Sequence, residues 1–186
     1  MNKETALDLI IFSPCSWINP QRLVVPEMFS EPECLSILNK MVIEHYGLST
    51  DFKKIESSSF VDVVVTNWSS LPQIAHLLAC RYHQAALNYQ GLMCEFSKAI
   101  QNFCSGPSGV TQPVLLGKHV CTETLEITSL SLLLSLSPVL PKSIVQRIPL
   151  LFSELCSENI GKKNNASITV LDFKLALQYA KNHRLF

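Results

Sequence analysis

The residues with the greatest chemical potential lie on one predicted helix, residues 71–89. His76, Cys80 and His83 share one face of it, because they are spaced by four and seven positions. Imidazole nitrogen and thiolate sulfur are ligands that zinc prefers, and an i, i+4 pair can chelate a metal. The two histidines are nevertheless separated by roughly 10 Å of helix rise, and no second Cys/His cluster offers further ligands. An ordinary polar face is the better interpretation, so we expect no metal site.

A thiol nucleophile is the second chemistry to weigh, with Cys121 as nucleophile and His119 as its base. Residues two positions apart on a helix do not face one another. The sequence also shows no acidic group to orient the histidine and no oxyanion-binding loop. A small thiol that packs like a hydrophobic residue is the simpler explanation. We therefore predict no catalytic residue and no cofactor.

Composition excludes several classes of function. The 186-residue chain is 47% hydrophobic and 16% charged, with fifteen Lys and Arg against fifteen Asp and Glu. Zero net charge gives no basic footprint for nucleic acid. The longest apolar run, residues 130–140, contains serines and a proline and cannot span a bilayer. We interpret the apolar excess as a protein interface rather than a membrane segment.

The cysteines and the N-terminal residues indicate a compartment. Seven cysteines occur without a C-x-x-C pair, which is typical of free thiols in a reducing cytosol. The apolar run at residues 9–12 is short and follows Glu4 and Asp8, so we do not expect a signal peptide. The protein is predicted to be cytoplasmic.

The spacing of apolar residues predicts an all-α fold: a compact, single-domain helical bundle with an extended, proline-rich N-terminal arm. Ser70 with Gln73, and Ser30 with Glu33, have the spacing of capping boxes. Residues 60–66 are rich in β-branched side chains, but a lone short strand would have no partner, so we favour a helix there. Helices are expected over most of residues 32–45, 71–89, 92–103, 123–137 and 168–182.

The chain is expected to consist of an arm and a body. Residues 1–29 would form the arm, packed on a helical body at 30–186. A candidate hinge lies near 104–113, where glycine and proline cluster.

Four residues are candidates for binding a protein partner: Trp17, Ile18, Arg22 and Trp68. The first three lie between prolines that keep residues 10–26 out of regular structure, so this apolar segment must lie on something. It either covers the protein's own core or completes an interface, where Trp and Arg are common anchors. We predict the interface for the arm, although a place in the core is the stronger interpretation for Trp68.

Four blocks of sequence resemble blocks of the OrgA/MxiK family and occur in the same order. None is a chemical signature, so the specificity comes from the four together. Segments 44–60 and 104–128 match no block, which leaves partner choice open there. The blocks are I-I-F-S-P-C-S-W-I-N-P-Q-R-L (10–23), W-S-S-L-P-Q-I-A-H-L-L-A-C (68–80), L-P-K-S-I-V-Q-R-I-P-L-L-F (140–152) and L-A-L-Q-Y-A-K (175–181).

The resemblance implies an SctK-type accessory protein of a bacterial type III secretion system. Such a protein is a non-enzymatic adaptor in the sorting platform, at the cytoplasmic face of the inner membrane. It would link the cytoplasmic domain of the inner-membrane ring protein (SctD type) to the pod protein (SctQ type), through protein contacts only. Two rivals remain open: a type III secretion chaperone, a class usually acidic and dimeric, and a cysteine-dependent enzyme, which would need one unusually reactive thiol.

Overall fold

The computed structural model describes residues 3–51, 59–106, 119–160 and 166–185. Within these ranges all regular structure is helical and no strand occurs. The predicted all-α fold class is therefore confirmed. The chain divides into two compact units. Unit 1 comprises Met1–Leu71 and Ser137–Ser157, and unit 2 comprises Pro72–Leu136 and Glu158–Phe186.

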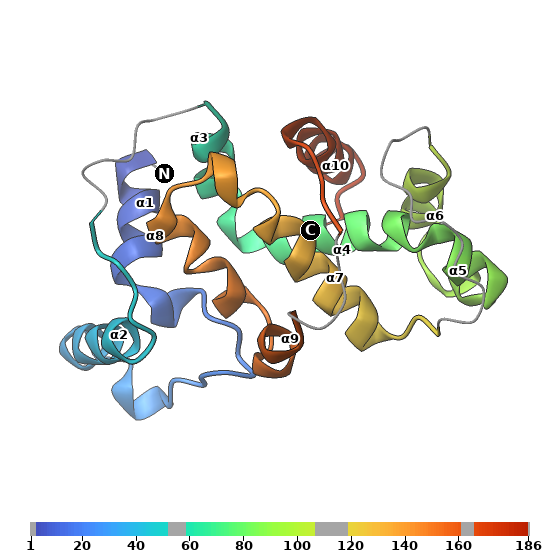
Figure 1. The fold of residues 1–186 in the computed structure, drawn as a ribbon. Coiled ribbons are helices and arrows are strands. Elements are labelled where there is room, and N and C mark those ends of the chain that lie inside the picture. The colour runs from blue at the N-terminus through green and yellow to red at the C-terminus, as the bar shows by residue number, and fades with distance from the viewer. Residues whose placement is uncertain (1–2, 52–58, 107–118, 161–165, 186) are drawn as a thin grey trace. The chain divides into compact units, whose positions relative to one another are not determined.

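Unit 1 combines the N-terminal part of the chain with a returning segment (Figure 1). Its described elements are α1 (Lys3–Phe12), α2 (Pro32–His45), α3 (Ser59–Thr66), α8 (Lys142–Val145) and the 3-10 turns η1 (Pro14–Ser16), η2 (Glu27–Phe29), η3 (Trp68–Ser70), η5 (Ser137–Val139) and η6 (Ile148–Leu151). Two helices cross the boundary between the units in sequence: α4 (Leu71–Tyr82) and α9 (Glu154–Asn159).

Unit 2 contains most of α4 together with α5 (Gln84–Tyr89), η4 (Leu92–Glu95), α6 (Lys98–Ser105), α7 (Thr122–Leu134) and α10 (Val170–Asn182). Ile74 and Leu78 of α4, Leu130 of α7, and Phe173 and Ala176 of α10 are almost fully buried. Their burial supplies the hydrophobic stabilisation of this unit.

Helix α7 resolves the ambiguity of the leucine- and serine-rich segment. Its residues Thr128–Leu133 are all buried, so this part of the helix is covered on every side, which explains why its leucines show no helical period. Its buried serines satisfy their hydroxyl groups within the helix, because Ser129 Oγ donates to Leu125 O at 2.7 Å and Ser131 Oγ donates to Ile127 O at 2.9 Å. A strand-like alternation of Leu and Ser is therefore compatible with a core helix.

Helix α2 has the bounds that its sequence predicts. Pro32 occupies the first turn, where a missing N–H costs nothing. After His45, Gly47 takes a left-handed conformation at φ +58°, and Leu48 N donates back to Ile43 O at 2.9 Å. This Schellman arrangement ends the helix and turns Leu48 into the core. The Ser30–Glu33 capping box was wrong, because Glu31 is the N-cap residue and makes no side-chain cap bond.

Three predicted elements differ from the structure. The arm is not wholly extended: α1 includes Ile10 and Phe12, since Pro14 excludes only the residues next to it from a helix. The helix predicted at 71–89 is interrupted at His83, which lies at φ −93°, ψ 11° between α4 and α5. The helix predicted at 92–103 begins instead as η4, because Ser97 caps a separate helix, α6.

Residues 60–66 are helical, as expected, and form most of α3. The predicted boundary at residue 29 falls inside unit 1, so the arm and α2 belong to one compact unit. Most of the candidate hinge, 104–113, lies outside the described residues.

Candidate partner-binding surface

The structure brings the four predicted partner-binding residues together inside unit 1. Ile18 belongs to an apolar cluster with Val42, Leu48 and Leu150, and it is 6% exposed. Trp68 is 5% exposed. The half-buried Trp17 packs edge-on against Trp68, with ring centroids 5.4 Å apart and an interplanar angle of 85°. This geometry is favourable for aromatic pairs and fixes the arm on its own unit.

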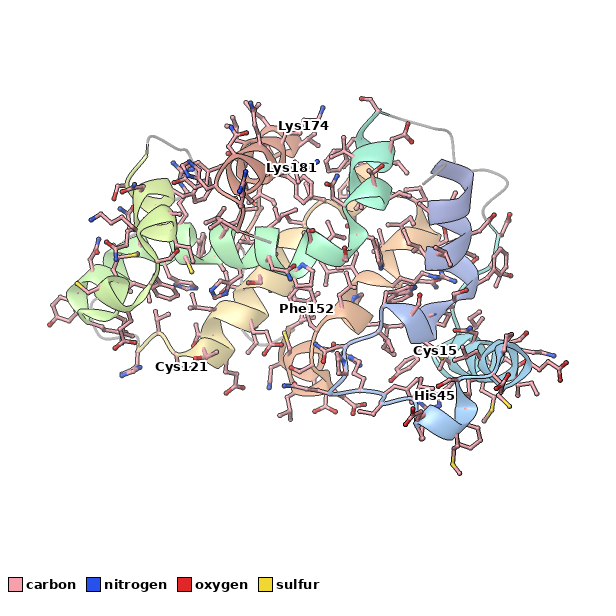
Figure 2. All side chains as sticks on the ribbon, turned by 180° about the vertical axis from the view of Figure 1, so that it is seen from behind. Cys15, His45, Cys121, Phe152, Lys174 and Lys181 are labelled. Atoms are coloured by element: carbon pink, nitrogen blue, oxygen red, sulfur yellow. The ribbon has the colours of Figure 1, made fainter. Side chains whose placement is uncertain are left out.

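Arg22 fastens the arm to the returning segment. Its Nε donates to Phe152 O at 2.6 Å, and its guanidinium also donates to Pro149 O at 3.1 Å and Ser153 O at 2.9 Å. A further hydrogen bond joins it to Ser157 Oγ. Phe152 is labelled in Figure 2. The three backbone acceptors lie within five consecutive residues, 149–153. One planar guanidinium can therefore donate to all three carbonyl oxygens of this turn.

Arg147 makes the reciprocal connection from the returning segment to α1. Its side chain is fully buried, and it donates to Ile10 O at 3.1 Å and Ile11 O at 2.8 Å, near the C-terminal end of α1. It also donates to Ser49 O at 2.9 Å and Ser143 O at 2.8 Å. Burial lowers the pKa of Arg147 to about 10, which still leaves a cation at neutral pH. A cation is favoured there by the negative end of the α1 dipole.

These contacts give the arm a role within its own unit. They favour the interpretation in which residues 10–26 cover the core of unit 1. Ile18 of the arm is buried there, and Trp17 of the arm packs on the buried Trp68. A direct contact of Trp17, Ile18, Arg22 or Trp68 with a partner remains a prediction.

An exposed apolar surface lies beside the anchored arm, and sequence reasoning missed it. We call it the α2 surface. Its two most exposed members are Met28, at 77%, and Val24, at 72%. Single exposed apolar residues are ordinary, whereas a group of them suggests an interaction site. These residues are near one another in sequence, since they lie on α2 and in the segment that leads into it. The α2 surface consists of Val24, Met28, Phe29, Ile37 and Met41.

The α2 surface is exposed because α2 is attached to unit 1 along one edge only. Val42 is the helix's buried residue, with Ile43 and Tyr46 partly buried against the same cluster. Asn39 Oδ1 accepts a hydrogen bond from Cys15 N at 2.9 Å, which ties that edge to the arm. Figure 2 labels Cys15 and His45, which mark the arm and the C-terminal end of α2.

Glutamates surround the α2 surface. Glu27, Glu31, Glu33 and Glu44 are all exposed, against the single exposed Lys40. Within the described ranges, no ion pair links these glutamates to a lysine or arginine. The surface is therefore both apolar and negatively charged.

The histidine and cysteine constellation does not assemble into a ligand set. His76 Nε2 lies 3.5 Å from Cys80 Sγ, but His83 Nε2 points to Thr128 Oγ1 at 2.9 Å. In the part of the chain that the structure describes, no group of three His, Cys, Asp or Glu side chains could hold a metal ion. Burial lowers the pKa of His76 and raises that of Cys80 to about 12, which keeps both groups neutral.

Cys121 is the exposed N-cap residue of α7. Its Sγ lies 3.2 Å from Thr124 Oγ1, and this hydrogen bond lowers the pKa of the thiol. The partner of Cys121 in this contact is thus a hydroxyl group and not His119. The local geometry is that of a helix N-terminus, where Cys121 is the N-cap residue.

None of the described helices is both long and apolar enough to cross a membrane.

Comparison with known proteins places these features in a family. Residues 7–182 match the profile of the family described as "Bacterial type III secretion apparatus protein (OrgA_MxiK)". The chain is also similar to the "Oxygen-regulated invasion protein OrgA" of Salmonella typhimurium strains 14028s and SL1344. Each is 32% identical over 175 residues, which cover 94% of this chain and 86% of the relative. No solved structure matches the chain.

Proposed function

The chain belongs to the OrgA/MxiK family of bacterial type III secretion apparatus proteins, and from this premise we propose that it is a non-enzymatic adaptor of the secretion system. It links the cytoplasmic domain of the inner-membrane ring protein (SctD type) to the pod protein (SctQ type). The single observation that carries this proposal is the family match over residues 7–182, which includes most of both units.

The α2 surface supports a role in binding proteins. It presents several apolar side chains beside an arm that two arginines hold in place, so its shape is set before any partner arrives. A preorganised surface loses less conformational entropy on binding. Trp17, which is half-buried at the edge of the arm, is proposed to contribute to the same interface.

The proposed location is the cytoplasmic face of the inner membrane, reached through protein contacts only. The cysteines fit a reducing compartment, because all seven are free thiols. The adaptor needs no catalytic centre, and the apparatus family is not described as an enzyme family.

The test is a pull-down from chemically crosslinked bacteria that assemble the secretion system. A tagged copy of the chain should recover both the ring protein and the pod protein. The double variant Ile37→Asp with Met41→Asp should lose at least one of them and reduce secretion, with a melting temperature within a few degrees of the wild type. Leu171→Asp with Leu175→Asp, an exposed pair on unit 2, is the matched control. Recovery of a secreted substrate alone, without ring or pod protein, would favour the chaperone and contradict the adaptor.

A further inference from the structure

We infer that the α2 surface binds an amphipathic α-helix that carries lysine or arginine residues beside its apolar stripe. The inference rests on the proposed function for the identity of the protein that supplies this helix. The chemistry of the contact rests on unit 1 alone.

The apolar residues of the α2 surface suit a helical ligand. Ile37 and Met41 lie one turn apart on α2 and therefore form a ridge along it. Met28 and Phe29 of η2 add apolar area. Methionine side chains are flexible and polarisable, which makes them common on surfaces that accept a helix face. An amphipathic helix would bury this ridge with residues at its own i, i+3 or i+4, and i+7 positions.

The glutamates beside the α2 surface indicate that its ligand is positively charged. Glu33 lies four residues before Ile37, and Glu44 lies three residues after Met41, so these side chains share one face of α2. Exposed Lys40 lies on the same face, so the two glutamates leave it with one net negative charge. Glu27 and Glu31 add two negative charges beside Met28 and at the start of the helix. A ligand helix with cations beside its stripe would pair with them, and an acidic helix would be repelled.

Helix stability does not explain all of these glutamates. Glu31 and Glu33 lie at the N-terminal end of α2, where the dipole favours a carboxylate. Glu44 lies in the last turn, where the dipole disfavours it. Lys40, four residues before Glu44, is one cation within reach of this carboxylate, and a cationic ligand would supply others.

Helix α10 of a second copy is the competing occupant that the chain itself offers. It exposes Leu171 and Leu175 together with Lys174 and Lys181, and both lysines are labelled in Figure 2. Its exposed apolar stripe consists of two residues only. It would therefore cover less of the α2 surface than a partner helix with a longer apolar stripe. The experiment must separate this occupant from a partner helix.

The probes are two fluorescein-labelled helical peptides of about eighteen residues, long enough to span α2. Both carry the same leucine stripe, flanked by lysines in one and by glutamates in the other. Titration of the full-length protein, followed by fluorescence anisotropy, should show that the acidic peptide binds at least about tenfold more weakly than the basic one. Binding of the basic peptide should weaken as salt is raised.

Two matched variants locate the site. Ile37→Asp with Met41→Asp should abolish binding of the basic peptide, whereas Leu171→Asp with Leu175→Asp should leave it unchanged. The pairs are comparable, at 62% and 58% exposed on α2 against 64% and 49% on α10. Glu33→Gln with Glu44→Gln, which disturbs no apolar contact, should weaken binding of the basic peptide several-fold and strengthen binding of the acidic one.

Several results would overturn the inference. They are equal binding of the two peptides, binding of neither, or loss of binding in the α10 variant but not in the α2 variants. Self-association in sedimentation velocity that the α2 variant and the α10 variant each remove would assign the surface to a second copy instead. Neither readout involves the ring or pod protein, so failure of the adaptor proposal is a separate result.

Discussion

Two guanidinium groups join the N-terminal segment of unit 1 to the segment that returns to it. Arg22 donates from the arm to backbone carbonyls at 149–153, and Arg147 donates from the returning segment to α1 and to Ser49. The two lie in blocks 10–23 and 140–152, which resemble the family. The two arginines therefore join these blocks by hydrogen bonds in both directions.

Replacing Arg147 with Met should destabilise the protein by roughly 3–5 kcal/mol, because three buried carbonyl groups and one partly buried carbonyl group lose their donor. Arg147→Lys should recover part of this loss, since an ammonium has fewer donors and no planar fork. Denaturant unfolding would measure both. Equal stability of wild type and Arg147→Met would show that the buried network contributes nothing net.

Two buried thiols of unit 2 make stability depend on pH. Burial raises the pKa of Cys80 above its ordinary value of 9.0 to about 12 and that of Cys104 to about 11. The unfolded thiols release protons above pH 9.0, whereas the folded thiols keep theirs. Their stabilisation is therefore complete below pH 9.0 and is lost as the pH rises toward the folded pKa values.

We expect the free energy of unfolding to fall between about pH 9 and about pH 11 in reducing buffer. The double variant Cys80→Ala with Cys104→Ala should show a smaller fall than the wild type. An identical pH dependence in the two proteins would contradict the assignment to these thiols.

At the scale of elements, α10 has the clearest start signal in the structure. Thr169 Oγ1 accepts from Asp172 N at 3.2 Å, and Asp172 Oδ2 accepts from Thr169 N at 2.9 Å, which completes a capping box. Thr169→Ala should cost about 1 kcal/mol of stability. Thr169→Ser, which keeps the hydroxyl, should cost much less. A loss of the same size in both variants would attribute the effect to the methyl group instead.

Local signals predicted those elements whose ends are set by nearby residues. Pro32 and Gly47 delimit α2, and the absence of a pairing strand correctly favoured a helix for α3. The interruption at His83 was missed because the apolar spacing continues through it, and nothing in the sequence announces the hydrogen bond to Thr128.

The candidate site was less predictable than the helices. The sequence identified Trp17 and Arg22 as important, but it could not show that Arg22 binds backbone carbonyls far along the chain, since any residue type can supply them. The apolar periodicity placed Met41 on the apolar face of α2. It could not show which part of that face is covered by another element and which part is exposed. The exposed edge, with Ile37, follows from tertiary packing alone.

At the scale of the whole molecule, the family match extends over residues 7–182 and so over most of both units. The adaptor role that we propose requires the chain to bind two partners at once, and the chain divides into two compact units. Simultaneous binding is what distinguishes an adaptor from a chaperone that holds one client.

Reconstitution with purified proteins tests this claim most directly. The chain is mixed with the cytoplasmic domain of the ring protein and with the pod protein of the same secretion system, and the mixture is analysed by size-exclusion chromatography with light scattering. We expect one complex that contains all three proteins, and no complex of ring and pod proteins when the chain is left out. Mutually exclusive binding of the two partners, or a ring–pod complex that forms equally well without the chain, would contradict it.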